Sequence, residues 1–435
     1  MDKDLKQTTV DQIPEKDPYA FSQKMYILQC ALAYFISIIT TGAYLAKLTT
    51  TIGISDGMTA ILSNISSLAC LFQLLSIPIS HKKNFKGSVI TTVFASQVLL
   101  GFLYLIPFFG FDSKVNSVLF FVCILFSYVF SQISGPLKFT WFMSLPSPER
   151  KGSFQSTVQM FSHATGLAFS FTASWLLDYF TETGKTEAMF ITFTTVIMVL
   201  SVLNLLTLSA SKEKPRAEMP KASLFGDVKS VLNQKGYPTY VLMYTLYATG
   251  IHITTAFIGT YQVKELGFSM IKVSTLSAIN AVAAIIFLAI FGNFARRRGL
   301  AKSILIGFPI YSVAYLLITF AIPENGFVML LLYYVISTLG SAAIVVGIEP
   351  ILFDTVPEEY RTTALSVKNF VAGITSFLTT IAITPLFNHI QSTNSVFGIK
   401  MYAQQLFGII SCLVLLASMV LFRIYVKQSG VKIGK

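Results

Sequence analysis

Long runs of apolar residues, separated by short polar gaps, recur through most of this 435-residue chain. The hydrocarbon core of a bilayer is about 30 Å thick, and a helix needs about 20 apolar residues to cross it. Because lipid offers no hydrogen-bonding partner to backbone amides, runs of this length must be helices. With 54% hydrophobic and only 12% charged residues, the chain is expected to be an all-α polytopic membrane protein rather than a string of soluble domains.

The apolar runs predict twelve transmembrane helices. Since the number of spans is even, both termini are expected on the same side of the membrane. The predicted spans are residues 24–48, 55–78, 87–109, 115–143, 153–179, 187–209, 238–262, 271–294, 302–322, 327–354, 363–388 and 400–427.

The basic residues indicate which side carries the termini. Alternate gaps, counted from the N-terminus, hold 24 of the 32 Lys and Arg residues. By the positive-inside rule, those gaps and both termini are cytoplasmic, and the protein is expected in the cell membrane. The net charge of +12 is then a consequence of topology, which argues against a nucleic acid as partner. The four cysteines lie inside apolar runs without metal-ligand spacing, so neither a metal nor a cofactor is expected.

An internal repeat divides the chain. The stretch Val115–Gly152 recurs in edited form at Phe327–Thr363, and a polar stretch lies between the two copies. An offset of about 211 residues superimposes three pairs of residues: Pro146 with Pro357, Arg150 with Arg361, and Lys138 with Glu349. The repeat predicts two pseudosymmetric six-helix bundles, at residues 1–210 and 238–435, joined by a cytoplasmic linker at residues 211–237.

A basic turn follows the second helix of each half. The turn in the second half resembles the signature G-x-x-x-D-R-x-G-R-R of the major facilitator superfamily at Gly292, Arg297, Gly299 and Lys302, with Arg296 in the acidic position. The resemblance implies a transporter whose two bundles rock about a central site and open it alternately to each side. It also implies that the first, fourth, seventh and tenth helices line the cavity.

Those four helices carry polar residues at helical spacing, as do the fifth and eleventh. In the fourth helix, Ser127, Ser131, Ser134 and Lys138 follow one another at steps of four, three and four, which places them on one face. Polar groups facing lipid are costly, so these faces are expected to line the cavity. The candidate substrate-binding residues are Gln29, Thr40, Tyr44, Ser131, Lys138, Gln159, Tyr244, His252, Glu349 and Asn369.

Lys138 and Glu349 are the strongest candidates for a role in binding or gating. The repeat places them at equal depth on facing helices, so a salt bridge between them is expected to close the cytoplasmic mouth. Protonation of Glu349 would break the bridge and couple proton binding to gating. His163, Arg150 and Arg361 are further coupling or gating candidates, whereas Lys368 is expected to be an interfacial anchor.

The sequence therefore predicts a secondary active transporter that moves a small organic solute by alternating access. Proton-coupled symport of a polar metabolite such as a sugar is favoured, with the protein acting as a monomer. Proton-coupled efflux of drugs or amphiphiles, and lipid flipping on the same fold, stay open as alternatives. An ATP-driven pump is not expected, since no G-x-x-x-x-G-K-[ST] loop is present. A membrane enzyme is also not expected, because the acidic residues of this chain are not clustered within the predicted spans.

Overall fold

The computed structural model describes residues 17–54, 62, 65–66, 68–82, 84–215, 223–268, 270–396 and 398–431. The elements of the N-terminal half are α1 (Ala20–Thr40), α2 (Gly42–Thr51), η1 (Cys70–Leu75), α4 (Ser76–Ser80), α5 (Lys86–Phe102), η2 (Ile106–Phe109), α6 (Ser113–Met143), η3 (Pro148–Arg150), α7 (Lys151–Glu182) and α8 (Thr186–Ala210).

A short helix, α9 (Leu224–Leu232), precedes the C-terminal half. The elements that follow are α10 (Tyr237–Thr255), α11 (Ile258–Thr260), η4 (Tyr261–Glu265), α12 (Met270–Arg298), α13 (Leu300–Ile318), α14 (Gly326–Ile348), α15 (Leu352–Thr355), η5 (Glu358–Tyr360), α16 (Arg361–Thr393), β1 (Ser395–Val396), β2 (Ile399–Lys400) and α17 (Ala403–Ser429).

Helices occupy the predicted spans wherever the structure describes them. Part of the second span, 55–78, lies outside the described residues. Four described spans are interrupted rather than continuous: the first at Thr41, the third after Phe102, the seventh after Thr255 and the tenth at Glu349. Seven described helical stretches are long and apolar enough to cross a membrane, beginning at residues 113, 186, 272, 300, 326, 358 and 403.

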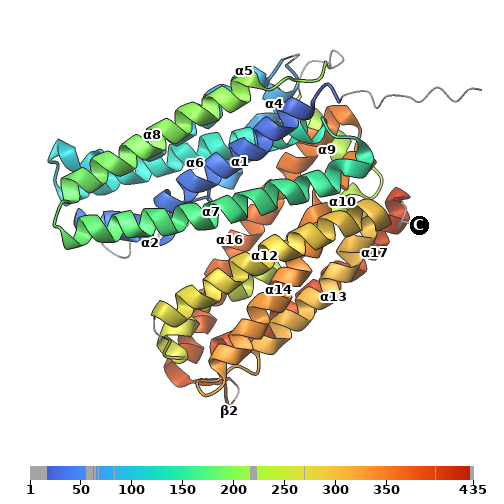
Figure 1. The fold of residues 1–435 in the computed structure, drawn as a ribbon. Coiled ribbons are helices and arrows are strands. Elements are labelled where there is room, and N and C mark those ends of the chain that lie inside the picture. The colour runs from blue at the N-terminus through green and yellow to red at the C-terminus, as the bar shows by residue number, and fades with distance from the viewer. Residues whose placement is uncertain are drawn as a thin grey trace, which may run out of the picture.

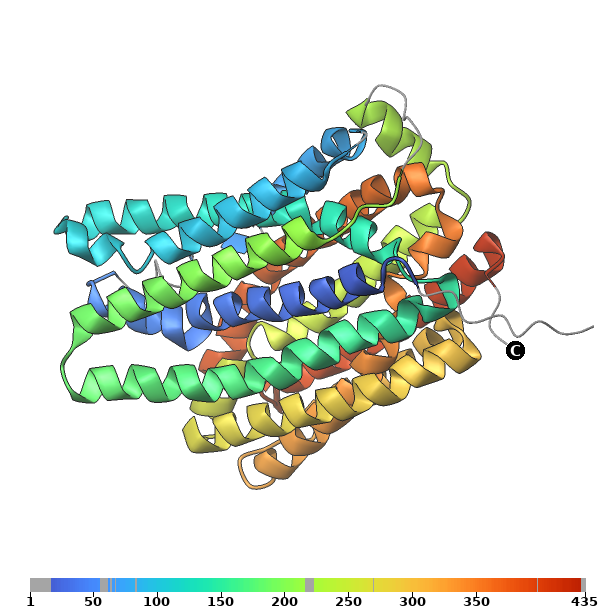
Figure 2. The ribbon, with the colours of Figure 1, turned by 45° about the horizontal axis from the view of Figure 1, so that its top comes forward.

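The helices form two groups that touch at one end. Figure 1 shows α1 and α5 to α8 in one group and α12, α13, α14 and α17 in the other, and the groups spread apart away from the C-terminus. The rotated view in Figure 2 shows the N-terminal helices side by side along their lengths. We call the end that holds η3, η5 and α9 the linker end. The opposite end, which holds η2 and the turn at 183–185, is the far end.

Contacts between the two groups are concentrated at the linker end. The hydroxyls of Ser76 and Ser366 are 2.6 Å apart, and the Thr362 hydroxyl donates to the Thr140 oxygen at 3.1 Å. Along α16, every residue in 362–368 is buried, whereas only Phe387 and Ile390 are buried in 373–393. The bundles are therefore packed together near the linker end and are less enclosed towards the far end.

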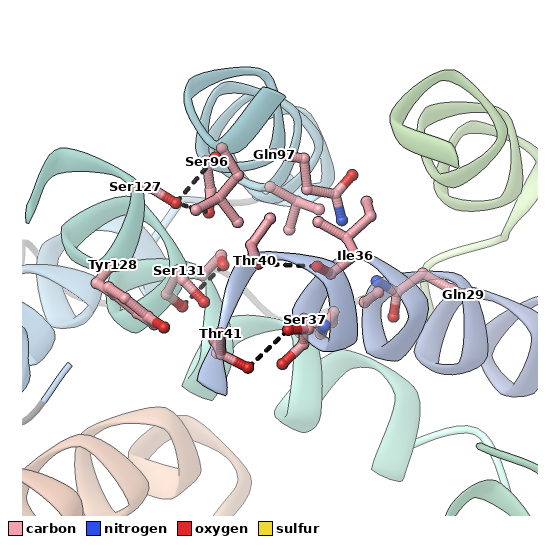
Figure 3. A pocket seen from close by; sticks show the side chains of 16 residues that line it. Gln29, Ile36, Ser37, Thr40, Thr41, Ser96, Gln97, Ser127, Tyr128 and Ser131 are labelled. Atoms are coloured by element: carbon pink, nitrogen blue, oxygen red, sulfur yellow. Dashed lines mark hydrogen bonds between the residues drawn. The ribbon is translucent and has the colours of Figure 1, made fainter. Parts of the chain in front are cut away.

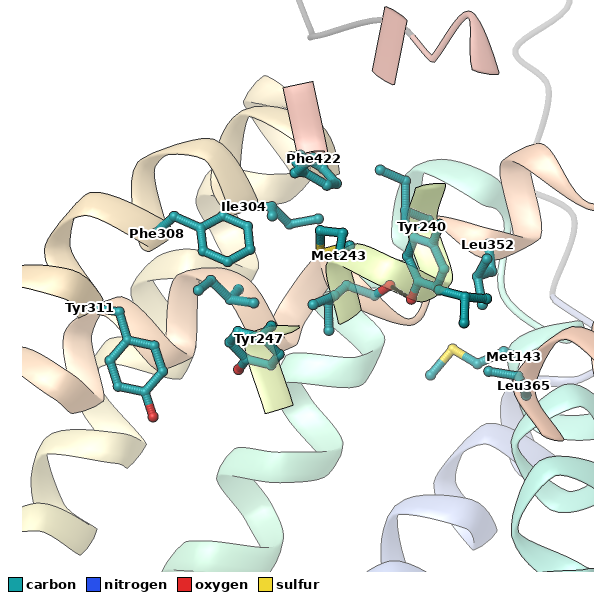
Figure 4. Packing of buried hydrophobic residues seen from close by; sticks show 14 of the residues in the cluster. Met143, Tyr240, Met243, Tyr247, Ile304, Phe308, Tyr311, Leu352, Leu365 and Phe422 are labelled. Carbon is teal, nitrogen blue, oxygen red and sulfur yellow. Dashed lines mark hydrogen bonds between the residues drawn. The ribbon is translucent and has the colours of Figure 1, made fainter. Parts of the chain in front are cut away.

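The hydrophobic core follows the same division. One cluster of buried side chains takes members from both halves, including Trp141 and Met143 of α6 and Leu365 of α16. Among the side chains labelled in Figure 4, Met143 comes from the N-terminal half and the others come from the C-terminal half. A second cluster, which contains Leu32 and Phe193, is built from the N-terminal half alone.

Small residues allow α13 and α14 to approach closely. A Cβ atom on Gly340 of α14 would lie 2.6 Å from the backbone nitrogen and 2.8 Å from the Cα of Tyr311 in α13. Because the obstacle is backbone, a side-chain rotation cannot relieve the clash. Close backbone approach through small residues is a common way for helices to pack in lipid, where the hydrophobic effect between helices is absent.

We expect Gly340→Ala to destabilise the protein by about 1–3 kcal/mol, because α13 and α14 would be forced apart. Thermal unfolding of the detergent-purified protein measures the effect. Gly87→Ala is the control, since a Cβ at Gly87 meets nothing within 4 Å. Equal melting temperatures for Gly340→Ala and the wild type would contradict the close packing.

Candidate functional site

A polar pocket of about 200 Å³ lies inside the N-terminal bundle between α1, α5 and α6 (Figure 3). We call it the α1/α6 pocket. Hydroxyl and amide groups make up most of its polar lining, together with one lysine. These polar lining residues are Gln29, Ser37, Thr40, Thr41, Ser96, Gln97, Ser127, Tyr128, Ser131, Ser134 and Lys138.

Several of the hydroxyl groups are already hydrogen-bonded to helix backbone. The Thr40 hydroxyl donates to the Ile36 carbonyl at 2.8 Å, and the Ser127 hydroxyl donates to the Ser96 carbonyl at 2.9 Å. Such bonds satisfy a hydroxyl in lipid without a second molecule. Ser37 and Ser131 are exposed, so the pocket is reached from the side where these residues lie.

The two glutamine amides of the pocket differ from the hydroxyls. Gln29 is 0% exposed and Gln97 is 6% exposed. Gln29 Nε2 and Gln97 Oε1 are buried, and neither has a hydrogen-bond partner within the part of the chain that the structure describes. An unsatisfied buried polar group costs about 1–3 kcal/mol, so this donor and this acceptor are available to a bound solute.

Four of the predicted substrate-binding residues therefore share one pocket: Gln29, Thr40, Ser131 and Lys138. The other predicted residues lie elsewhere. The Tyr44 hydroxyl lies 3.0 Å from the Ser174 hydroxyl, towards the far end. Gln159, His252 and Asn369 are partly buried on α7, α10 and α16, and they do not line the α1/α6 pocket.

The ion pair expected between Lys138 and Glu349 does not form in the structure. Glu349 pairs instead with Lys368 of α16, with 2.6 Å between Lys368 Nζ and Glu349 Oε1. The expectation that Lys368 is an interfacial anchor is also wrong, because its side chain is 0% exposed. The Glu349 side chain is 28% exposed, so the carboxylate is the accessible member of the pair.

The register of the two halves explains this difference. The turn η3 begins at Pro148 and η5 begins at Glu358, so the two halves correspond here at an offset of 210 rather than 211. At that offset Lys138 is equivalent to Ile348. The helix α14 ends at Ile348, two residues before Pro350, and Glu349 follows as its C-cap residue.

Tyrosines of α10 surround the Glu349–Lys368 pair. Lys368 Nζ lies 3.9 Å from the centre of the Tyr244 ring, a distance at which the ring attracts the cation. The Tyr240 hydroxyl donates to the Ile348 carbonyl at 2.5 Å, and so satisfies an oxygen at the end of α14. The predicted residues Tyr244 and Glu349 thus belong to one arrangement, which lies in the C-terminal half.

A separate ion pair joins the two halves at the linker end. Lys151 Nζ lies 3.2 Å from Asp354 Oδ1 and 5.3 Å from the centre of the Phe353 ring. The Arg361 guanidinium donates to the Phe353 carbonyl at 2.9 Å and lies over the same ring at 4.9 Å. We call Lys151, Phe353, Asp354 and Arg361 the linker-end clasp.

The sequence pattern predicted Arg361, which belongs to this clasp. It also predicted Arg150, but in the structure the neighbouring residue Lys151 makes the contact. Arg150 is exposed on η3, whereas Lys151, the first residue of α7, is 5% exposed. The predicted His163 is not part of the clasp. Its ring lies edge-on to the Tyr34 ring at 5.6 Å, in the wall of a second pocket between α1, α7 and α12.

The model of the Major Facilitator Superfamily matches residues 26–380 and, again, residues 240–433. The chain belongs to the major facilitator superfamily. The second match begins inside the C-terminal half, which fits the internal repeat seen in the sequence. As a member of this family the protein is a multi-pass membrane transporter of small molecules, and the predicted family is confirmed.

Solved structures support the same fold. A bacterial homologue of the iron transporter ferroportin in an outward-facing state is 16% identical, with a TM-score of 0.72, and covers 94% of this chain and 98% of its own. The E. coli fucose:proton symporter FucP is 14% identical, with a TM-score of 0.68 and the same two coverages. The human organic anion transporter MFSD10 is 11% identical, with a TM-score of 0.67, and covers 94% of this chain and 100% of its own.

At these identities the likeness concerns the fold alone. It confirms the predicted twelve transmembrane helices in two six-helix bundles. No curated protein sequence matches the chain. Since the similar structures are named for different solutes, the α1/α6 pocket and the Glu349–Lys368 pair must carry any statement about substrate and coupling.

We expect Lys368→Met to destabilise the protein by about 1.5–3 kcal/mol, because the Glu349 carboxylate loses its charge-assisted hydrogen bond to Lys368. The double variant Lys368→Met with Glu349→Gln should melt closer to the wild type than Lys368→Met alone. Thermal unfolding in detergent measures both, and Lys400→Met, at an exposed position, is the control. Additive losses in the double variant would show that the pair contributes no coupling energy.

Proposed function

We propose that this protein is a secondary active transporter that moves a small, polar, hydroxyl-bearing solute, such as a sugar, together with protons. The units that move are residues 1–210 and 238–435, joined by the linker 211–237, in a protein that acts as a monomer in the cell membrane. The observation that carries the proposal is the Glu349–Lys368 pair, in which an accessible carboxylate lies beside a fully enclosed cation.

The proposed orientation puts the linker end in the cytoplasm, because the gaps that hold most Lys and Arg residues lie at that end. In that orientation the packed end of the bundles is the cytoplasmic end, and the state described is closed to the cytoplasm. The Lys151–Asp354 contact joins α7 of one bundle to α15 of the other, so it must break when the cytoplasmic side opens. The clasp is therefore a gate that replaces the predicted Lys138–Glu349 bridge.

Glu349 is the proposed proton acceptor. Protonation would remove its negative charge and leave Lys368 with the Tyr244 ring as its remaining close partner. The pair joins the end of α14 to α16, and Arg361 of the clasp begins α16. The gate lies two helical turns from the pair, on a helix that rises about 1.5 Å per residue. A change at the pair can therefore be transmitted along this one rigid helix to the gate.

The α1/α6 pocket is the proposed solute site. Its volume of about 200 Å³ lies below the 300–1,000 Å³ typical of drug-sized ligands, and so favours a small solute. Its free amide donor and acceptor suit hydroxyl groups, which both donate and accept hydrogen bonds. The apolar side chains of Ala33, Ile36, Val93 and Leu100 line the rest of the pocket and can contact the carbon skeleton of such a solute.

We expect a disulfide between Ser76→Cys and Ser366→Cys to stop transport, because the two hydroxyl oxygens lie 2.6 Å apart across the bundle contact. Transport should return when a reductant is added. Uptake of a solute found by a thermal-shift screen of sugars and polyols into proteoliposomes measures the effect. Each single cysteine variant is a control, and continued transport by the oxidised double variant would contradict a mobile contact at this end.

We expect Glu349→Gln to abolish proton-driven accumulation of the same solute while solute exchange without a gradient continues, since an amide cannot carry the proton. Proteoliposomes with an imposed pH gradient and a trapped pH indicator report accumulation and proton entry together. Glu324→Gln changes an exposed acid near the far end and is the control. Accumulation at the wild-type level in Glu349→Gln would remove Glu349 from the coupling role.

A further inference from the structure

The charge inside the α1/α6 pocket is unbalanced. Lys138 is the one lysine or arginine among its lining residues, and none of those residues is an acid. Within the described part of the chain, no carboxylate lies within 4.0 Å of Lys138 Nζ, and Lys138 makes no hydrogen bond to a protein group. Glu349, which the sequence offered as a partner, is held by Lys368.

An ammonium group that is partly removed from water and has no counter-ion is costly, and the cost is recovered when an anion binds beside it. The sequence alone suggested a site in which Lys138 and Glu349 cancel. With the acid paired elsewhere, the pocket has a formal charge of +1 and a lining of hydroxyl and amide groups. Such a site selects a solute with one negative charge over its neutral analogue.

The polar groups also give the pocket a direction. α1 runs from the linker end towards the far end and α6 runs back towards η3, so Gln29 of α1 and Lys138 of α6 both lie at the linker end of the pocket. The lining of α1 continues from Gln29 to Thr41, about 18 Å at 1.5 Å per residue. A solute can therefore place a charged group at the Lys138 end while its hydroxyls lie along α1 and α5.

We propose that the solute of the α1/α6 pocket is a small hydroxylated monocarboxylic acid. Lys138 binds its carboxylate, Gln29 Nε2 donates to an oxygen near that end, and Gln97 Oε1 accepts from a hydroxyl. This assignment rests on the proposed function and narrows it from polar solutes in general to their acids. A phosphate ester carries about 1.5 to 2 negative charges at neutral pH, and the single positive charge of Lys138 would not balance them.

The test uses pairs of compounds that share hydroxyls and differ in the acid group. The pairs are gluconate with glucitol, galacturonate with galactose, and glycerate with glycerol. Calorimetric titration of the full-length, detergent-purified protein measures affinity. We expect the acid of at least one pair to bind at least tenfold more tightly than its neutral partner. Equal or tighter binding of every neutral partner, or no binding by any of the three acids, overturns the proposal.

Variants of Lys138 connect the preference to the pocket. Lys138→Gln should weaken binding of the preferred acid at least tenfold, Lys138→Arg should retain the preference, and Lys138→Glu should favour glucosamine over gluconate. Lys185→Gln, at an exposed far-end position, is the matched control. The melting temperature of each variant without solute shows whether it folds. A folded Lys138→Gln that keeps the full acid preference places the anion elsewhere and overturns the assignment.

The outcomes separate this inference from the proposed function. If neutral sugars bind and are accumulated with protons, the acid assignment fails while proton-coupled transport stands. If acids bind in a Lys138-dependent way but are not accumulated by a pH gradient, the assignment stands while the proposed coupling fails.

Discussion

The bilayer offers no hydrogen bonds, and this constraint governs how the protein treats its polar groups. Many serines and threonines donate back to their own helix, as Thr40 does to the Ile36 carbonyl. Among the described residues of the N-terminal half, several buried amide groups have no hydrogen-bond partner. The amides of Gln29 and Gln97 are distinguished from the others because both line the same pocket as Lys138.

In the C-terminal bundle the same constraint acts on a charge. Pro350 ends α14 after Ile348, and Glu349 caps the helix where it meets Lys368 of α16. The freed Ile348 carbonyl is satisfied by the Tyr240 hydroxyl. The Tyr240 hydroxyl thus replaces a hydrogen bond that the helix loses at its end, beside the carboxylate that pairs with Lys368.

The two bundles carry different kinds of functional group in this arrangement. The neutral and basic groups that can hold a solute lie between α1, α5 and α6, whereas the ion pair that can respond to protons lies between α14 and α16. Contact between the bundles is made at the linker end by the clasp and by paired hydroxyls such as those of Ser76 and Ser366. In the proposed mechanism, solute and proton would thus bind in different bundles, on opposite sides of the contact between them.

The sequence by itself determined the helices, their number, the repeat and the family, because each depends on properties of single segments. The length of an apolar run fixes a transmembrane span, and residues at steps of three and four share one face of a helix. For this reason the sequence could identify Gln29, Thr40, Ser131 and Lys138 as residues of one site. Only the tertiary structure decided that Glu349 pairs with Lys368, and that Lys151 rather than Arg150 meets Asp354. Each residue turns a helix by about 100°, so an offset of one residue redirects a side chain to another neighbour. Such pairings depend on how two helices are rotated and placed relative to each other, and the periodicity of either helix alone does not contain that information.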